Sequence, residues 1–215
     1  MEDANIVEGP AVDAELADAI TARQFRPSLI GPEAWEGYRF SGMEIRIKES
    51  TDLYGAVLWP SASVLCHFLE TNQDKYNLKD KNVIELGAGT GLVTIVSSLL
   101  GAKVTSTDLP DVEQRFPRAT HCFDYILAAD VVYAHPYLDE LMDTFDYLCQ
   151  ENTRILWAMR FRLDPENSFV ERVGRRFHVE QLYDLPSLSI KLYRAWRKGR
   201  RTEGGGEAAW SQSSP

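Results

Sequence analysis

One short segment, Asn82–Gly91 (NVIELGAGTG), restricts the fold of this chain more than any other part of its sequence. Its first half is apolar apart from Glu85, as expected for a strand buried on both faces of a parallel sheet. Its second half carries three glycines, and the apolar stretch 92–100 that follows has the length of a helix. A strand, a glycine turn and a helix in this order gather backbone N–H groups around a small ligand, because glycine places no Cβ between backbone and ligand. The segment therefore predicts a ligand site at the end of a parallel strand.

Strand and helix patterns alternate along the rest of the chain, and this alternation predicts an α/β fold with right-handed crossovers. We expect a Rossmann-like, mostly parallel sheet with helices on both faces and an N-terminal β-hairpin. The expected strands are 82–86, 102–108, 123–130, 153–159, 179–182 and 189–196; the expected helices are 61–72, 92–100, 137–149 and 168–177; the hairpin is 38–48. Ligands of such sheets bind beyond the carboxyl ends of the strands, where Gly87, Asp108 and Asp130 fall.

Length and local composition predict one folded domain with a segment on each side. A chain of 215 residues can bury a substantial single core. Residues 1–34 are rich in Ala, Asp, Glu and Pro, and we expect a flexible arm with a short helix near 14–22. Residues 35–196 form the expected α/β domain. Residues 197–215 are basic and then rich in Gly and Ser, which predicts a disordered tail.

Charge and composition argue against several classes of function. A formal charge of −9 disfavours a nucleic-acid partner, which needs Lys and Arg at the phosphates. No apolar run approaches the roughly 20 residues of a membrane span. The three cysteines and four histidines lack the spacing of a disulfide framework or a metal site, so neither is expected. We expect a cytoplasmic protein; the basic run Arg197–Arg201 could also direct it to the nucleus, although such runs are more often solvated tails.

The glycine spacing distinguishes between two kinds of ligand. A nicotinamide or flavin site carries G-x-G-x-x-G, whereas this chain has Leu92 at the third glycine position and an acid, Glu85, on the strand itself. The pattern E-x-G-x-G-x-G is similar to that of class I S-adenosylmethionine-dependent methyltransferases. In such a site Glu85 would favour the cationic methionyl end, and the backbone of Gly87 and Gly89 would take up the amino-acid portion. Asp108, about 17 residues past the last glycine, would accept hydrogen bonds from both ribose hydroxyls.

Two further motifs narrow the resemblance. The run Tyr54–Pro60 (YGAVLWP) precedes the glycine loop, and D-V-V-Y at 130–133 ends a later apolar strand. Together with E-L-G-A-G-T-G and T-D-L-P, they make residues 37–196 resemble the family 16 protein-lysine methyltransferases, the methyltransferase-like 21 group. The resemblance implies methyl transfer from S-adenosylmethionine to a lysine of a protein substrate. Known members of the group modify Hsp70-type chaperones and the valosin-containing AAA ATPase, so the resemblance also implies chaperone or ATPase binding.

The resemblance also assigns residues to the expected site. Asp130 and Tyr133 would border the lysine channel, where a carboxylate can hold the incoming ammonium and an aromatic ring can form one wall. A helix cap with a core tyrosine is the alternative interpretation of the same pair. The reaction is an in-line attack by a neutral amine and needs neither a metal nor a covalent nucleophile. The expected cofactor contacts are Trp59, Glu85, Gly87, Ala88, Gly89, Gly91, Asp108 and Ala129.

The chain departs from the family pattern after the ribose acid. A methyltransferase of this class carries a helix, a strand and a cofactor-contacting loop before the D-x-x-Y strand, whereas only Leu109–Cys122 stands there, about fourteen residues. A helix, a strand and two loops need roughly twice that length. We therefore predict an internal deletion of one helix–strand unit. It would remove a wall of the adenine pocket and leave a neighbouring strand with an open edge.

Three hypotheses remain open at this point. The first is an active protein-lysine methyltransferase. The second is a catalytically impaired variant that still binds a chaperone or an AAA ATPase. The third, a nicotinamide oxidoreductase, is disfavoured by Leu92 and Glu85. In each case we expect a monomer.

Overall fold

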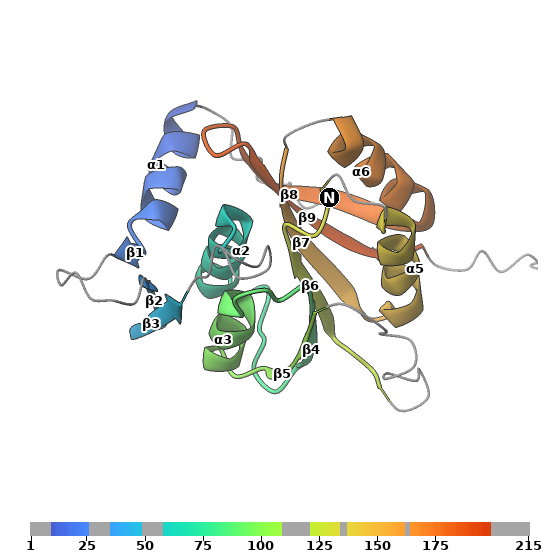
Figure 1. The fold of residues 1–215 in the computed structure, drawn as a ribbon. Coiled ribbons are helices and arrows are strands. Elements are labelled where there is room, and N and C mark those ends of the chain that lie inside the picture. The colour runs from blue at the N-terminus through green and yellow to red at the C-terminus, as the bar shows by residue number, and fades with distance from the viewer. Residues whose placement is uncertain are drawn as a thin grey trace, which may run out of the picture.

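A six-stranded sheet forms the centre of the computed structural model (Figure 1). The structure describes residues 10–25, 35–48, 58–108, 121–133, 137–161 and 164–198. The strands lie in the order β5-β4-β6-β7-β9-β8, where β4 is Asn82–Leu86, β5 Lys103–Thr107, β6 Tyr125–Ala129, β7 Arg154–Arg160, β8 Phe177–Leu185 and β9 Ile190–Arg197. The first four run parallel, and β9 is antiparallel to both β7 and β8. This arrangement confirms the mostly parallel α/β sheet that the sequence predicts.

Helices cover both faces of the sheet. On one face lie α2 (Pro60–Thr71) and α3 (Leu92–Leu99), and on the other α5 (Leu138–Leu148) and α6 (Asp164–Arg176) (Figure 1). Every residue of β4 after Asn82 is buried, as is expected of a central parallel strand covered on both faces. One apolar core therefore forms beneath α2 and α3, and a second beneath α5 and α6.

The predicted hairpin forms part of a small second sheet. Strands β2 (Trp35–Phe40) and β3 (Met43–Lys48) pair antiparallel, and the short strand β1 (Gln24–Phe25) adds to β2. The two turn residues, Ser41 and Gly42, both have positive φ, 50° and 72°. Such a turn matches the right-handed twist of the strands that it joins.

The N-terminal helix α1 (Pro10–Thr21) packs against α2 and β8. Its residue Ile20 is 4% exposed and belongs to a buried cluster with Val64, Leu185 and Ile190. A short helix was expected in this region, but a flexible arm was expected around it. Helix α1 thus packs on the folded domain, because Ile20 contacts Leu185 and Ile190, which are distant in sequence.

Arg23 connects this N-terminal unit to α2. Its Nε donates a hydrogen bond to Nδ1 of His67 at 3.0 Å, and its guanidinium forms an ion pair with Glu70. The same guanidinium lies 4.8 Å from the centre of the Phe40 ring. Burial, reinforced by the Arg23 charge, lowers the pKa of His67 to about 4, so the imidazole stays neutral and accepts this hydrogen bond at physiological pH.

Most remaining elements agree with the sequence prediction, apart from their ends. Helix α6 begins at Asp164 rather than 168, and β8 extends further in both directions than the predicted 179–182. The three cysteines are free thiols, Cys66 and Cys149 buried and Cys122 exposed. In the described ranges no helix is long and apolar enough to cross a membrane.

The position of the predicted deletion falls at one edge of the sheet. Among the described strands, β5 is outermost there, and β6 pairs with the opposite side of β4. Residues 109–120 lie outside the described residues, as do Tyr54, Gly55 and the C-terminal tail after residue 198. The described part of the sheet therefore ends at β5 on this side.

The packing of α1 can be tested by truncating its buried side chain. We expect Ile20→Ala to lower the free energy of unfolding by about 2–4 kcal/mol, because it removes buried methyl groups from a closed cluster. Glu15→Ala, an exposed site on the same helix, should change it by less than about 0.5 kcal/mol. Urea unfolding measures the free energy of unfolding of both variants and of the wild type. Equal stability of the two variants would show that α1 does not contribute to the core.

Candidate functional site

The glycine loop leaves the carboxyl end of β4 with a backbone that favours glycine. Gly87, Gly89 and Gly91 all have positive φ, 66°, 50° and 81°. At Gly87 a Cβ would also lie only 2.7 Å from Cγ1 of Val131, in the segment after β6. Glycine is therefore required at Gly87 for two independent reasons, backbone conformation and the close approach of a neighbouring loop.

Glu85 is buried directly beneath the loop. It is 2% exposed, and one carboxylate oxygen accepts a hydrogen bond from the hydroxyl of Thr94 in the first turn of α3. Burial raises the pKa of Glu85 to about 7; hydrogen bonds from the Thr94 side chain and backbone oppose that shift, and the nearby charge of Asp108 adds to it. A cation placed beside Glu85 would favour its charged form and would be attracted in turn.

Asp108 follows β5 and lies against the glycine loop. Its Oδ2 accepts a hydrogen bond from the backbone N–H of Gly89 at 2.8 Å. The backbone of the two strand ends is also joined, because Ala88 N–H donates to the Thr107 carbonyl at 3.0 Å. The two features that the sequence predicts to share one site thus meet at the same rim of the sheet.

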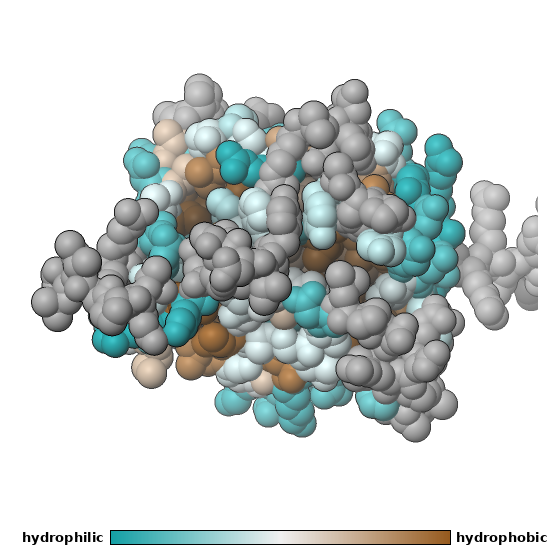
Figure 2. All heavy atoms as spheres, in the orientation of Figure 1, coloured by the Kyte–Doolittle hydropathy of each residue, from teal (hydrophilic) through white to brown (hydrophobic). Residues whose placement is uncertain are grey.

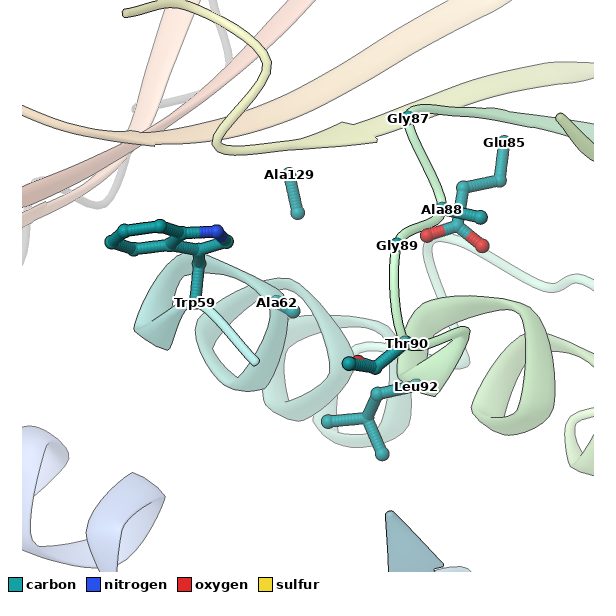
Figure 3. Close-up of a pocket in the computed structure, with 9 residues that line it drawn as sticks. All are labelled: Trp59, Ala62, Glu85, Gly87, Ala88, Gly89, Thr90, Leu92 and Ala129. Atoms are coloured by element: carbon teal, nitrogen blue, oxygen red, sulfur yellow. The ribbon is translucent and has the colours of Figure 1, made fainter. Parts of the chain in front are cut away.

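A small hollow opens beside the loop (Figure 3). Its lining residues are Trp59, Ala62, Glu85, Gly87, Ala88, Gly89, Thr90, Leu92 and Ala129. In Figure 3 the Trp59 ring and the glycine loop lie on opposite sides of the view, and Ala129 lies between them above α2. Glu85 is the one charged side chain of these nine. The hollow is partly open to solvent, and its lining combines a glycine loop, one acid and one aromatic ring.

The hollow contains most of the cofactor contacts that the sequence predicts. Six of the eight predicted residues line it, whereas Gly91 and Asp108 are outside the lining. Three lining residues were not predicted. Thr90 belongs to the glycine motif, Leu92 begins α3 directly after it, and Ala62 lies three residues after Trp59 near the start of α2, a spacing that could have indicated it.

The two residues predicted at the lysine channel follow β6. Asp130 is 6% exposed and has φ 55°, an unusual conformation for a residue with a side chain. Its backbone N–H donates to the Ala158 carbonyl at 2.9 Å, and its Oδ1 accepts from the Arg160 N–H at 3.1 Å. Tyr133 is partly buried. Neither residue lines the hollow, so the lysine-channel assignment stays a prediction.

Strained backbone beside a buried carboxylate often marks a functional loop. In this structure the segment after β6 lies next to Gly87, where the side chain of Val131 approaches the glycine loop. The carboxyl ends of β4, β5 and β6 therefore supply a glycine loop and two acids, Asp108 and Asp130, to one rim of the sheet. In the described part of the chain, no group of His, Cys, Asp and Glu is arranged to hold a metal ion.

The fold is that of the Rossmann-like methyltransferases. A T. thermophilus 16S rRNA N2 G1207 methyltransferase, solved in complex with AdoMet and guanosine, superposes with a TM-score of 0.60 at 15% identity over 80% of this chain and 52% of that chain. A SAM-dependent methyltransferase from Agrobacterium tumefaciens superposes with a TM-score of 0.53 at 16% identity, over 80% and 72% of the two chains. At these identities the likeness concerns the fold.

Sequence comparison gives the family. The family model described as "Lysine methyltransferase" matches residues 39–118 and 113–176, and the chain belongs to this family. Mouse protein-lysine methyltransferase METTL21E is 51% identical over 221 residues, 88% of this chain and 91% of that protein. Zebrafish METTL21A is 33% identical over 77% and 89% of the two chains, and Xenopus tropicalis EEF1A lysine methyltransferase 3 is 36% identical over 74% and 84%.

The same comparisons locate a missing segment. The mouse alignment runs over 221 positions, while 88% of this chain's 215 residues is about 189, so about 32 positions have no residue here. The family model matches in two stretches that meet at 113–118, within the short link. A helix, a strand and two loops have about this length. These findings support the predicted deletion, and it falls immediately after the strand that forms the described edge of the sheet.

The Gly87 contact leads to a stability prediction. Gly87→Ala should destabilise the fold by about 2–4 kcal/mol, since it adds a clash with Val131 to the strain of positive φ. Gly42→Ala is the matched control, because it has a similar φ with nothing within 4 Å and should cost only about 1 kcal/mol. Denaturant unfolding compares the two. A smaller loss for Gly87→Ala than for Gly42→Ala would contradict the close approach.

Glu85 leads to a pH prediction with a defined sign. Its pKa of about 7 in the folded state lies above the ordinary 4.5, so the folded protein holds a proton that the unfolded chain releases between these values. The contribution of this bound proton to the stability of the fold is therefore greatest below pH 4.5 and is lost as the pH rises to about 7. Glu85→Gln removes the titration. We expect this variant to gain roughly 2–3 kcal/mol of stability relative to wild type between about pH 5 and pH 8.

Urea unfolding at several pH values measures that difference, and the exposed control Glu140→Gln on α5 should show none. A pH-independent difference between Glu85→Gln and wild type would mean that Glu85 is charged throughout, against the burial that the structure shows.

Proposed function

We propose that this chain transfers a methyl group from S-adenosylmethionine to the Nζ of a lysine in a protein partner. One observation carries the proposal: the glycine loop, the buried carboxylate of Glu85 and the carboxylate of Asp108 meet at one rim of the sheet, where Gly89 N–H donates to Asp108. Membership in the lysine methyltransferase family supports the reaction type.

The residues of the hollow suit the cationic end of this cofactor. S-adenosylmethionine, when bound, supplies a methyl group on a positively charged sulfur. The buried acid Glu85 offers the opposite charge, and the Trp59 ring, which lines the hollow, is the residue that could present a π face to a cation. The glycines let the backbone N–H groups reach the amino-acid portion, and Asp108, at the rim beyond β5, is the residue that would hold the ribose.

The acceptor lysine would approach past the segment after β6. A lysine must lose its proton before it can attack, and a carboxylate near its path can orient the ammonium and receive that proton through solvent. Asp130 and Tyr133 are the residues proposed for this channel. The hydrogen bond from Arg160 N–H to Asp130 fixes one carboxylate oxygen, and thereby the orientation of this acid.

The partner is a folded protein of the Hsp70-type chaperone or AAA ATPase class. The family resemblance in D-V-V-Y and W-P supports this choice, and the net charge of −9 is compatible with a lysine-presenting surface. The relatives differ in their named targets, since one of them is an EEF1A lysine methyltransferase. The same charge argues against nucleic acid as the partner, and we place the protein in the cytoplasm and, through its basic tail, also in the nucleus.

A second candidate follows from the deletion. About 32 residues of the relatives are absent, and they would follow the ribose acid, where the adenine of the cofactor lies in this fold class. A pocket without this wall loses buried apolar contact with the ligand. In this alternative the chain binds its protein partner but methylates it poorly or not at all.

Cofactor titration separates the two candidates. We expect the chain as written to bind S-adenosylmethionine poorly or not at all by isothermal titration calorimetry, because the adenine side is incomplete. A variant that carries the mouse METTL21E segment between residues 108 and 121 should bind at least about tenfold tighter, about 1.4 kcal/mol. Low-micromolar binding by the unmodified chain would contradict the predicted effect of the deletion.

Radiolabelled methyl transfer to purified Hsp70-type and AAA ATPase partners then tests the function itself. In the restored variant, Asp108→Ala should weaken cofactor binding, and Asp130→Asn should lower methylation with little effect on cofactor affinity. Glu140→Ala, at an exposed position of α5 that does not line the hollow, is the control. Partner capture without methylation, even by the restored variant, would favour the binding protein over the enzyme.

A further inference from the structure

The outer edge of β5 carries backbone groups directed away from the sheet. Lys103 N–H donates to the Lys81 carbonyl on the β4 side at 2.8 Å, and β5 pairs with β4 in parallel throughout its length. Successive residues of a strand point their N–H and C=O groups to alternate sides. The groups of Val104 and Ser106 are therefore directed outward, where the described residues contain no further strand.

An apolar strip accompanies this edge. Leu99, near the end of α3, is 41% exposed, and Ile95 lies one turn before it. Val104 of β5 packs with Ile95 against the core beneath α3 and is itself only partly buried. Figure 2 shows hydrophobic side chains at the surface over α3. Edge hydrogen-bonding groups and exposed apolar side chains thus lie next to each other, a combination that favours association through strand pairing.

We propose that this edge is the interface of a homodimer, in which β5 of one copy pairs antiparallel with β5 of a second copy. The pairing has a two-fold axis at Thr105, so that Val104 of each copy faces Ser106 of the other. These are the residues whose N–H and C=O groups point outward, and in this register they form the hydrogen-bonded pairs of the ladder. The two sheets then continue into each other through the interface.

The charges at the ends of β5 favour the same partner. Lys103 and Asp108 are both exposed and lie at opposite ends of the strand. A two-fold antiparallel arrangement brings the Lys103 end of each copy to the Asp108 end of the other, so unlike charges approach at both ends. A parallel arrangement would bring like charges together. An isologous interface also doubles the Leu99 and Val104 strip, because each copy presents the same surface. The sequence analysis expected a monomer, and the β5 edge leads to the opposite conclusion.

Sedimentation equilibrium of the full chain over a wide concentration range tests the dimer. Ser106→Pro removes an outward N–H that β4 does not use, whereas Ser106→Ala at the same position keeps it. We expect the wild type and Ser106→Ala to dimerise alike, and the dissociation constant of Ser106→Pro to rise at least about tenfold, since two hydrogen bonds per dimer are lost.

A second pair of variants tests the same interface without proline, which could disturb the fold. Leu99→Asp should weaken the dimer, while Met43→Asp, at a residue that is 54% exposed on the distant hairpin, should leave it unchanged. Circular dichroism establishes that each variant is folded.

Disulfide trapping tests the register. Thr105→Cys in a Cys122→Ser background should form a disulfide-linked dimer, because a non-hydrogen-bonded antiparallel pair brings the two Cα atoms to about 4.5 Å. Gln73→Cys in the same background, at an exposed position in the turn after α2, should not.

The proposal is overturned by a monomer at every concentration, or by dimerisation that Ser106→Pro and Leu99→Asp leave intact. It is also overturned if the paired control variants weaken dimerisation equally. A failure of Thr105→Cys to cross-link while both weakening variants act as expected would overturn the two-fold register at Thr105.

Discussion

The hydrogen bond between Gly89 N–H and the Asp108 carboxylate is the interaction on which the site depends. It joins the ends of two neighbouring parallel strands, and the loop that it holds is also limited by Val131 on its other side. A loop held on both sides presents a fixed backbone, and a fixed backbone can bind a ligand without first being ordered. This fixed backbone requires glycine at Gly87, where the backbone conformation and the neighbouring Val131 side chain both exclude a Cβ.

The electrostatics of the site follow from this packing. Glu85 is buried because the loop and α3 cover it, and the cover raises its pKa to about 7. A buried acid without a cation is unfavourable for the fold at neutral pH, but a cationic ligand relieves the repulsion between Glu85 and Asp108 and is bound more tightly for that reason. The same group therefore destabilises the empty site and favours a sulfonium ligand.

The extent to which the sequence predicts this structure depends on the range of the interactions involved. Strands such as β4 and β6 are apolar over their whole length, and their pattern alone identifies them. The packing of α1 could not be predicted, because Ile20 contacts Leu185 and Ile190, which are separated from it by most of the chain. The engagement of Asp108 by the loop was missed for a similar reason: spacing places both features at one rim, but the hydrogen bond depends on how two loops fold against each other.

Ancestry and present capability are separate properties of this chain. The motif residues proposed to bind the methionyl end lie before the predicted deletion and are all present, and the hollow by Trp59 and the glycine loop forms in the folded chain. The predicted deletion lies after Asp108, in the link where the two matched stretches of the family model overlap. One local deletion there would have two physical consequences, an incomplete pocket and, in the described part of the sheet, an outer edge at β5. A partner strand at β5 would satisfy the edge but would not by itself rebuild the adenine wall, so pairing between copies and cofactor affinity can vary independently.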